Sequence, residues 1–210
     1  MQRKIIKYSF SILLLLVVAY NSVYFKKLDE VKATASNGFD AAKYARNFYN
    51  NKLLPNLNRA IEIDTLIQLL KTTPEQTFKD YSHALDIGNT RYFLVKGEGN
   101  ITTIGEDAIT VALKNDSGKK EVKIATEFIY GNAIRDASGL MNLNDFSSIM
   151  DFNNVSEEVN KIIRKEVVPV FKSKAKEGDL VQFSGAVELN GAHLNLDSIK
   201  VVPVTVTIVK

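Results

Sequence analysis

The chain contains no cysteine. That absence excludes disulfides, cysteine-ligated zinc, a thiol nucleophile and a lipid-modified N-terminal cysteine. Histidine is nearly as scarce, because only His83 and His193 occur, too far apart in the sequence to form a metal-site motif. Each is expected to be a surface residue rather than a catalyst. With no Gly-x-Ser-x-Gly turn to support a serine nucleophile, we assign no catalytic residue, no metal ligand and no cofactor.

A basic excess is missing from most of the chain. The formal net charge of the 210 residues is +3. Residues 1–38 contain six Lys/Arg and two Asp/Glu, whereas residues 89–210 contain fifteen and sixteen. Binding of single-stranded nucleic acid needs a basic groove and aromatic stacking platforms, and neither is evident in the C-terminal region. We therefore expect no nucleic-acid partner.

One long apolar run lies near the N-terminus. The 18 residues from Tyr8 to Phe25 are uncharged and have lysine or arginine on both sides. As a helix they would span about 27 Å, close to the ~30 Å hydrocarbon core of a bilayer. We interpret this run as an uncleaved signal anchor, which makes the membrane the first predicted partner. Its anchoring residues include Tyr8, Leu13, Leu14, Leu15, Leu16, Val17 and Phe25.

Two other interpretations of the run stay open. A secretory signal peptide would be cleaved near Ala33-Thr34-Ala35, where small residues have suitable spacing. That site lies ten residues past the apolar run and beyond several charged side chains. A helix buried in the folded protein is the third interpretation. An anchor would hold most of the chain outside the cytoplasm at the membrane, and cleavage would release it into the periplasm.

The rest of the chain divides by the spacing of its apolar residues. The spacing is helical up to residue 88, and from about residue 91 it is mainly alternating. We predict three regions: a signal anchor and linker at 1–35, a helical region at 36–88 and a β-domain at 89–210. The helical region is too short to bury enough surface alone, so we expect it to pack on the β-domain.

Local signals mark three helices in the helical region. Asp40 is predicted to cap a helix that Pro55 interrupts. Asp64 is predicted to cap a second helix. The run "TPEQ" at 73–76 predicts a third helix that opens with a capping box and a proline in its first turn.

The β-domain is predicted to contain five strands. They cover residues 91–105, 108–114, 121–129, 179–189 and 192–208. In the third strand, alternate residues from Val122 to Phe128 are expected to face inward. Asn190-Gly191 is the strongest hairpin signal. A helix capped by Ser156 separates the third and fourth strands, and this order is typical of an OB-type barrel. The predicted fold class is therefore α+β, with an OB-like five-stranded antiparallel barrel.

Four stretches carry a family resemblance. They read "FDAAKYARNFYNNKLLPNL", "FLVKGEGNITTI", "IYGNAIRDASGLMNLNDFSSIMDF" and "GDLVQFSGAVEL". In this order they resemble the bacterial family of predicted periplasmic lipoproteins, a domain of unknown function, over most of residues 36–208. The resemblance implies export, anchoring, no assigned activity and an association with sugar-uptake systems. Because this chain has no cysteine to lipidate, its apolar N-terminal helix would have to provide the anchor.

Residues 131–153 form the least regular stretch between the predicted strands and helix. They combine glycines and asparagines with apolar residues and hold the pair Arg135-Asp136. One interpretation is an ordered crossover that covers one end of the barrel, with the Arg-Asp pair bonded inside it. The other is a polar cleft in which Asn132, Arg135, Asp136 and Asp145 meet a ligand such as a sugar, or a partner surface.

These observations predict a membrane-anchored extracytoplasmic binding or scaffold module that is not an enzyme. A transporter or a solute-binding protein is the expected protein partner. The alternative is an enzyme acting on an envelope carbohydrate, with Asp136 and Asp145 as acid and base. A nucleic-acid-binding OB protein is a weaker alternative, because the required basic stripe is missing.

Overall fold

The computed structural model describes residues 38–85, 88–114 and 120–209. The predicted signal anchor, its cleavage site and residues 115–119 between the second and third predicted strands lie outside these ranges. Residues Phe39–Lys210 belong to one compact unit. Among the described residues, no helix combines the length and the apolar composition needed to cross a membrane.

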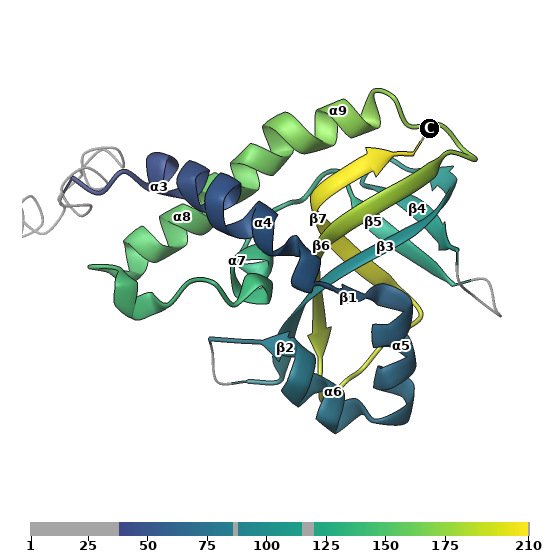
Figure 1. The fold of residues 1–210 in the computed structure, drawn as a ribbon, viewed down its shortest axis with the longest axis horizontal. Coiled ribbons are helices and arrows are strands. Elements are labelled where there is room, and N and C mark those ends of the chain that lie inside the picture. The colour runs from purple at the N-terminus through teal and green to yellow at the C-terminus, as the bar shows by residue number, and fades with distance from the viewer. Residues whose placement is uncertain (1–37, 86–87, 115–119, 210) are drawn as a thin grey trace, which may run out of the picture. The chain divides into compact units, whose positions relative to one another are not determined.

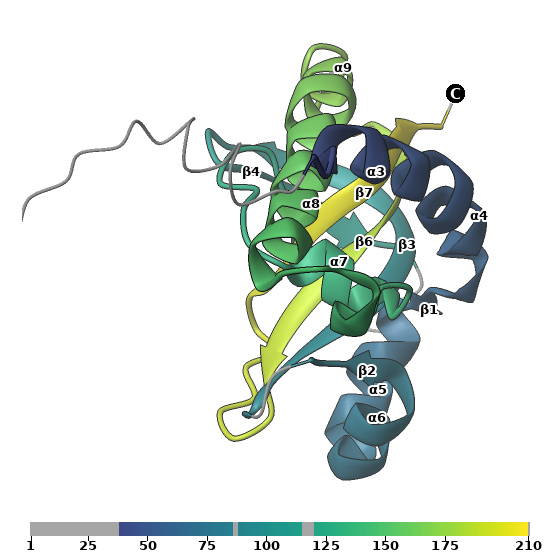
Figure 2. The same cartoon turned by 90° about the vertical axis from the view of Figure 1, so that its left-hand side faces the viewer.

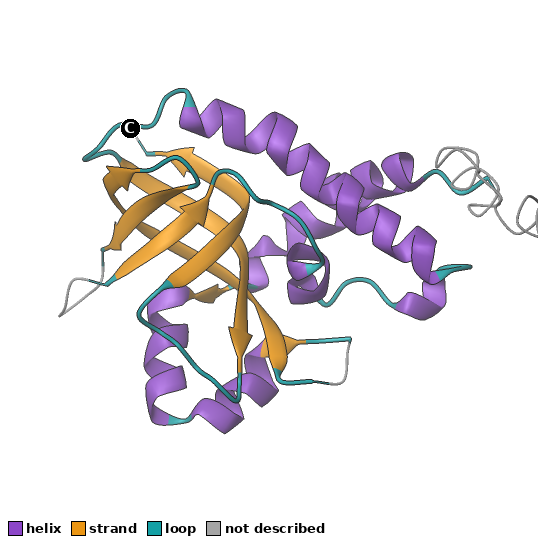
Figure 3. Cartoon of the chain, turned by 180° about the vertical axis from the view of Figure 1, so that it is seen from behind, coloured by secondary structure: helices purple, strands orange, loops and turns teal. Residues whose placement is uncertain are grey.

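Five long strands close into a barrel (Figures 1 and 3). They are β3 (Thr90–Ile104), β4 (Ala108–Leu113), β5 (Glu121–Ala125), β6 (Leu180–Asn190) and β7 (Ile199–Ile208). Around the barrel the order is β3-β4-β5-β7-β6, and β6 pairs back to β3. The predicted OB-type barrel is confirmed. The barrel is mixed rather than wholly antiparallel, since β5 and β7 run parallel. A closed ring with an odd number of strands cannot alternate direction at every pair.

Strand β3 is the longest strand and contacts both neighbours closely. It pairs with β6 from Thr90 to Asn100 and with β4 from Gly99 to Ile104. A Cβ atom on Gly99 would lie 2.2 Å from the carbonyl oxygen of Ala112 on β4. Only glycine fits this close approach of two backbones, which gives the glycine a structural role.

Two long helices each contain a π-helical turn before a proline. The first runs through α3 (Ala41–Phe48), a π turn (Tyr49–Leu53) and α4 (Leu54–Asn56). The second runs through α8 (Ile149–Ile162), a π turn (Ile163–Val167) and α9 (Val168–Lys172). The prediction that Pro55 interrupts the first helix is wrong, because the wider turn accommodates a residue that has no amide donor. The Asp40 cap is confirmed, since its Oδ1 accepts from the backbone amide of Lys43 at 2.9 Å.

A second helical pair follows. Helices α5 (Ile63–Thr72) and α6 (Pro74–Tyr81) lie between two short strands, β1 (Ile61–Glu62) and β2 (Ser82–His83), which both pair with β3. Asp64 lies in the first turn of α5, where Glu62 is the N-cap, so the predicted cap was two residues late. Thr73 does precede α6, but its side chain makes no capping hydrogen bond. The predicted capping box is therefore absent there.

Two buried apolar clusters lie on opposite sides of the barrel wall. One fills the barrel and its junction with α5, and includes Leu66, Leu70, Phe93, Val111, Ile124, Phe183 and Val201. The other lies among α3, α8 and the outer barrel surface, and includes Phe48, Leu53, Ile134, Val155, Val159 and Ala186. The helical region thus packs into both clusters rather than forming a core of its own.

Three predicted details differ from the structure. Phe128 is 65% exposed rather than inward-facing, because β5 ends at Ala125 and the next two amides both donate to the carbonyl of Asp107. Asn190 ends β6, but an eight-residue connection rather than a two-residue hairpin leads to β7. The helix before β6 is capped by Ser148, whose Oγ accepts from the amide of Asp151 at 3.0 Å, so Ser156 lies in its middle.

Candidate functional site

The irregular stretch contains a short buried helix. Helix α7 (Ala133–Ser138) lies between α8 and strands β3 and β6 (Figure 2), and all six of its residues are buried. It ends at Gly139, whose φ of 62° lies in the left-handed region. An added Cβ there would lie 2.8 Å from the imidazole of His83. Because its polar side chains are buried together with its apolar ones, the sequence shows no amphipathic helical period.

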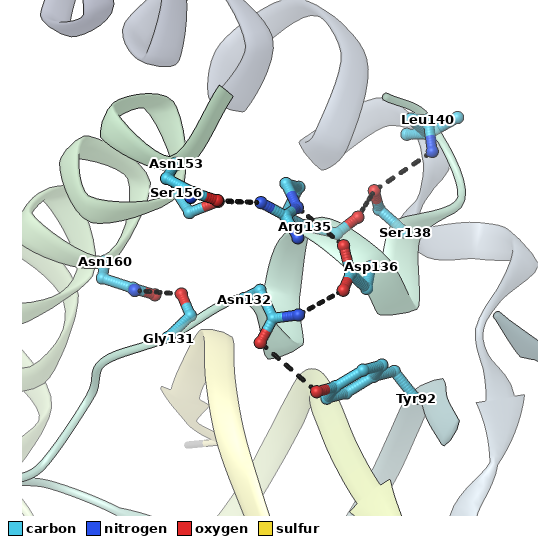
Figure 4. Close-up of polar contacts among 10 residues, drawn as sticks. All are labelled: Tyr92, Gly131, Asn132, Arg135, Asp136, Ser138, Leu140, Asn153, Ser156 and Asn160. Atoms are coloured by element: carbon cyan, nitrogen blue, oxygen red, sulfur yellow. Dashed lines mark hydrogen bonds and ion pairs between the residues drawn. The ribbon is translucent and has the colours of Figure 1, made fainter. Parts of the chain in front are cut away.

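Arg135 is the centre of the polar contacts of α7 (Figure 4). Its Nε donates to Oδ1 of Asp136 at 2.6 Å. Its Nη1 donates to Oδ1 of Asn153 and to Oγ of Ser156, each at 3.1 Å. The guanidinium carbon lies 3.8 Å from the ring centroid of Phe152 on α8. The side chain is only 5% exposed, so these contacts replace most of the water that an isolated cation would keep.

The network continues from Arg135 to the barrel and along α8 (Figure 4). Asn132 donates through Nδ2 to Oδ2 of Asp136 and accepts through Oδ1 from the hydroxyl of Tyr92 at 3.3 Å. Asn160 donates from α8 to the carbonyl of Gly131 at 2.8 Å. These bonds join β3, α7 and α8, and they hold both oxygens of Asp136.

A cleft of about 640 Å³ opens beside this network. Two of the predicted site residues, Asn132 and Arg135, line it. The other lining residues are Leu85, Gly131, Asn142, Leu143, Asn144, Ile149, Phe152, Asn153, Ser156 and Glu157. The cleft therefore combines one buried cation, several amide side chains and three exposed aliphatic residues.

The other two predicted residues, Asp136 and Asp145, line a second cavity of about 300 Å³ beside His83, which shares Leu85 and Asn142 with the cleft. Asp145 is exposed and ends a short 3-10 turn (Leu143–Asp145). Burial, and secondarily the charge of Asp145, raise the pKa of Tyr44 above its usual value. The four predicted residues thus line two adjoining cavities, two residues in each.

Several polar residues of the site were not predicted. Asn153, Ser156 and Asn160 contact the α7 segment from α8. They recur at i, i+3 and i+7, which places them on one face of the helix. Ser156 and Asn160 are buried. In the sequence, these three residues form a polar stripe on an otherwise apolar helix face, and this stripe could have indicated the site. The interpretation of Ser156 as an N-cap placed the start of the helix too late to show it.

In the described part of the chain, no group of three or more histidine and carboxylate side chains is arranged to hold a metal ion.

Comparison with known proteins identifies the family and confirms the fold. The family described as predicted periplasmic lipoprotein (DUF2291) matches residues 13–207. A solved structure titled as an OB-fold protein from Thermotoga maritima is similar, with a TM-score of 0.73 and 28% sequence identity. That alignment covers 82% of this chain and 99% of the other. No curated protein sequence matches.

Proposed function

Because this chain belongs to the predicted periplasmic lipoprotein family, we propose that it is a non-enzymatic binding module on the extracytoplasmic side of the membrane. The family description assigns the extracytoplasmic location. We also propose how the chain is attached to the membrane. With no cysteine to carry a lipid, the apolar run Tyr8 to Phe25 serves as the anchor.

The cleft beside Arg135 is the observation that carries a binding role. Its volume is within the ~300–1,000 Å³ common for small-molecule sites. The network around it, from Tyr92 through Asn132 to Asp136, holds its polar wall in place before any ligand arrives. Preorganised polar groups beside apolar surface favour specific binding, since little ordering is left to be done on association.

The carbohydrate-acting enzyme receives less support. A general acid or base needs an oxygen free to exchange a proton with substrate. Asp136 is 3% exposed, and its oxygens accept from Arg135 and from Asn132. Both oxygens are therefore already engaged inside the protein, and neither is free to meet a substrate. Asp145 would have to act without a matched partner.

We further propose that the partner is a transporter subunit or a solute-binding protein. The support is the association with sugar-uptake systems that the family resemblance implies. The exposed aliphatic residues around the cleft, Leu85, Leu143 and Ile149, offer apolar surface for such a partner.

Crosslinked pull-down of the full-length protein from native membranes tests the proposal. Two baits are compared with the natural chain: Ile149→Asp at the cleft and Val170→Asp on α9. These residues are similar exposed aliphatics, at 64% and 53% exposure, so both variants should fold. A transporter subunit or solute-binding protein should be captured by the natural chain and by Val170→Asp, and lost with Ile149→Asp. Capture of the same proteins by all three baits would contradict the role of the cleft.

A further inference from the structure

Free donors outnumber free acceptors among the described side chains that line the cleft. Oδ1 of Asn153 accepts from Arg135, and Oδ1 of Asn142 accepts from the backbone amide of Asn144 at 3.0 Å. These bonds determine which end of each amide is the oxygen. Within the described ranges neither Nδ2 group donates to another part of the protein, so each presents its N–H groups as free donors.

Arg135 adds a further donor. Its Nε and Nη1 make all the hydrogen bonds described above, and Nη2 has no acceptor among the described residues. Nη2 is also not one of the fully enclosed side-chain atoms without a partner in that part of the chain, so it keeps some access to solvent. Arg135 lines the cleft, and we take its uncommitted N–H groups as further donors there.

Most acceptors at the cleft are engaged instead. Oγ of Ser156 and Oδ1 of Asn132 already accept from the protein. Oε1 of Glu157 accepts from Arg164 at 2.5 Å. Among the described side chains of the lining, this leaves Oε2 of Glu157 and the amide oxygen of Asn144 as free acceptors. A sugar hydroxyl both donates and accepts, so a sugar would meet too few acceptors here. A ligand group that contains only acceptors satisfies the free donors and brings no donor that would be left unpaired.

The other side chains that line the cleft indicate the chemistry of the rest of the ligand. Leu85, Leu143 and Ile149 expose aliphatic surface, which favours an apolar body. Asp136 already balances the charge of Arg135, so a singly charged planar head fits better than a dianion such as phosphate. We infer that the cleft binds monocarboxylates with an apolar body, an assignment that rests on the proposed binding function.

Isothermal titration calorimetry on the full-length protein in nanodiscs tests the inference, with empty nanodiscs as the blank. The probes are 4-phenylbutyrate, 4-phenylbutanamide and 4-phenylbutylamine, which share a body and differ in the head. The carboxylate should bind saturably, the neutral amide more weakly and the cationic amine not at all. Equal binding of acid and amine, or no saturable binding of the acid above the blank, would overturn the inference.

A matched pair of variants locates the binding. Asn142→Asp keeps the oxygen that accepts from residue 144 but replaces the donor with a negative charge. This variant should weaken the binding of 4-phenylbutyrate by about tenfold in Kd, which corresponds to about 1.4 kcal/mol. Asn195→Asp makes the same change in an equivalent turn outside the cleft, where Oδ1 accepts from the amide of Asp197 at 2.9 Å, and should change nothing. Unchanged affinity in Asn142→Asp overturns the assignment. The two proposals can fail separately. If 4-phenylbutyrate does not bind but Ile149→Asp still loses its protein partner, the assignment to monocarboxylates is wrong, whereas the proposed binding module is supported.

Discussion

Arg135 is the residue on which the crossover between β5 and α8 depends. It bonds its neighbour Asp136 and reaches Asn153 and Ser156 on α8. Removing the cation would leave Asp136 buried without its charge partner, and such a loss costs about 3–5 kcal/mol. The same side chain lines the cleft, so stability and binding converge on one residue.

Arg135→Ala should therefore lower the melting temperature. A loss of ~3 kcal/mol corresponds to roughly 6–12 °C in a domain of this size. Lys123→Ala is the control, since Lys123 is an exposed cation on β5 and should shift the temperature by little. Calorimetry of both variants measures the difference. Small and equal shifts would show that the network contributes little to stability.

At the scale of elements, the first long helix is tied to the barrel through its π turn. Tyr49 begins that turn, and its hydroxyl donates to the carbonyl of Val204 on β7 at 2.9 Å. Arg46 and Glu166 form an ion pair between α3 and the π turn after α8. Burial, and secondarily Glu166, raise the pKa of Tyr49 above its usual value.

This pKa shift predicts a loss of stability in alkaline solution. The folded state holds the Tyr49 proton more tightly than the unfolded chain, so the contribution is complete below about pH 10 and declines as pH rises through the raised pKa. Tyr49→Phe should be less stable at neutral pH by about 1 kcal/mol, from the lost hydrogen bond, yet decline less steeply above about pH 10. Urea unfolding across this range measures both effects. A decline as steep as that of the natural chain would assign the alkaline sensitivity to other groups.

At the scale of the whole molecule, the helices and the barrel form one unit. Residues of α3 and its π turn, Phe48, Tyr49 and Leu53, belong to the same buried cluster as the barrel residue Ala186. Helix α5 adds Leu66 and Leu70 to the other cluster. Burying each large apolar side chain contributes about 1.5–3 kcal/mol, against a typical net stability of ~5–15 kcal/mol.

A chain that begins at residue 89 should therefore fail to fold cooperatively, although it contains every long strand. A chain that begins at residue 36 should unfold in a single transition. Circular dichroism during heating distinguishes the two. A cooperative transition in the shorter chain would show that the barrel is an independent domain and that the helices are accessory.

Local patterns in the sequence were enough to predict the order of the main elements, the Asp40 cap and the inward-facing Val122 and Ile124 of β5. These features depend on residues close together in the chain, because capping and alternation act over a few positions. The OB-type order of strands and helix followed from them, and so did the candidacy of Asn132 and Arg135 for a site.

Four features depend on the three-dimensional fold: the parallel closure of β5 on β7, the exposure of Phe128, the helical state of α7 and the placement of Asp145 in the cavity that adjoins the cleft. Each depends on partners far away in the sequence. The carbonyl of Asp107 accepts from the two amides that follow β5, and α7 packs between α8 and the barrel. A pattern in the sequence records which side chains are apolar, whereas the fold determines which surfaces they meet, and that information lies in the partner segment.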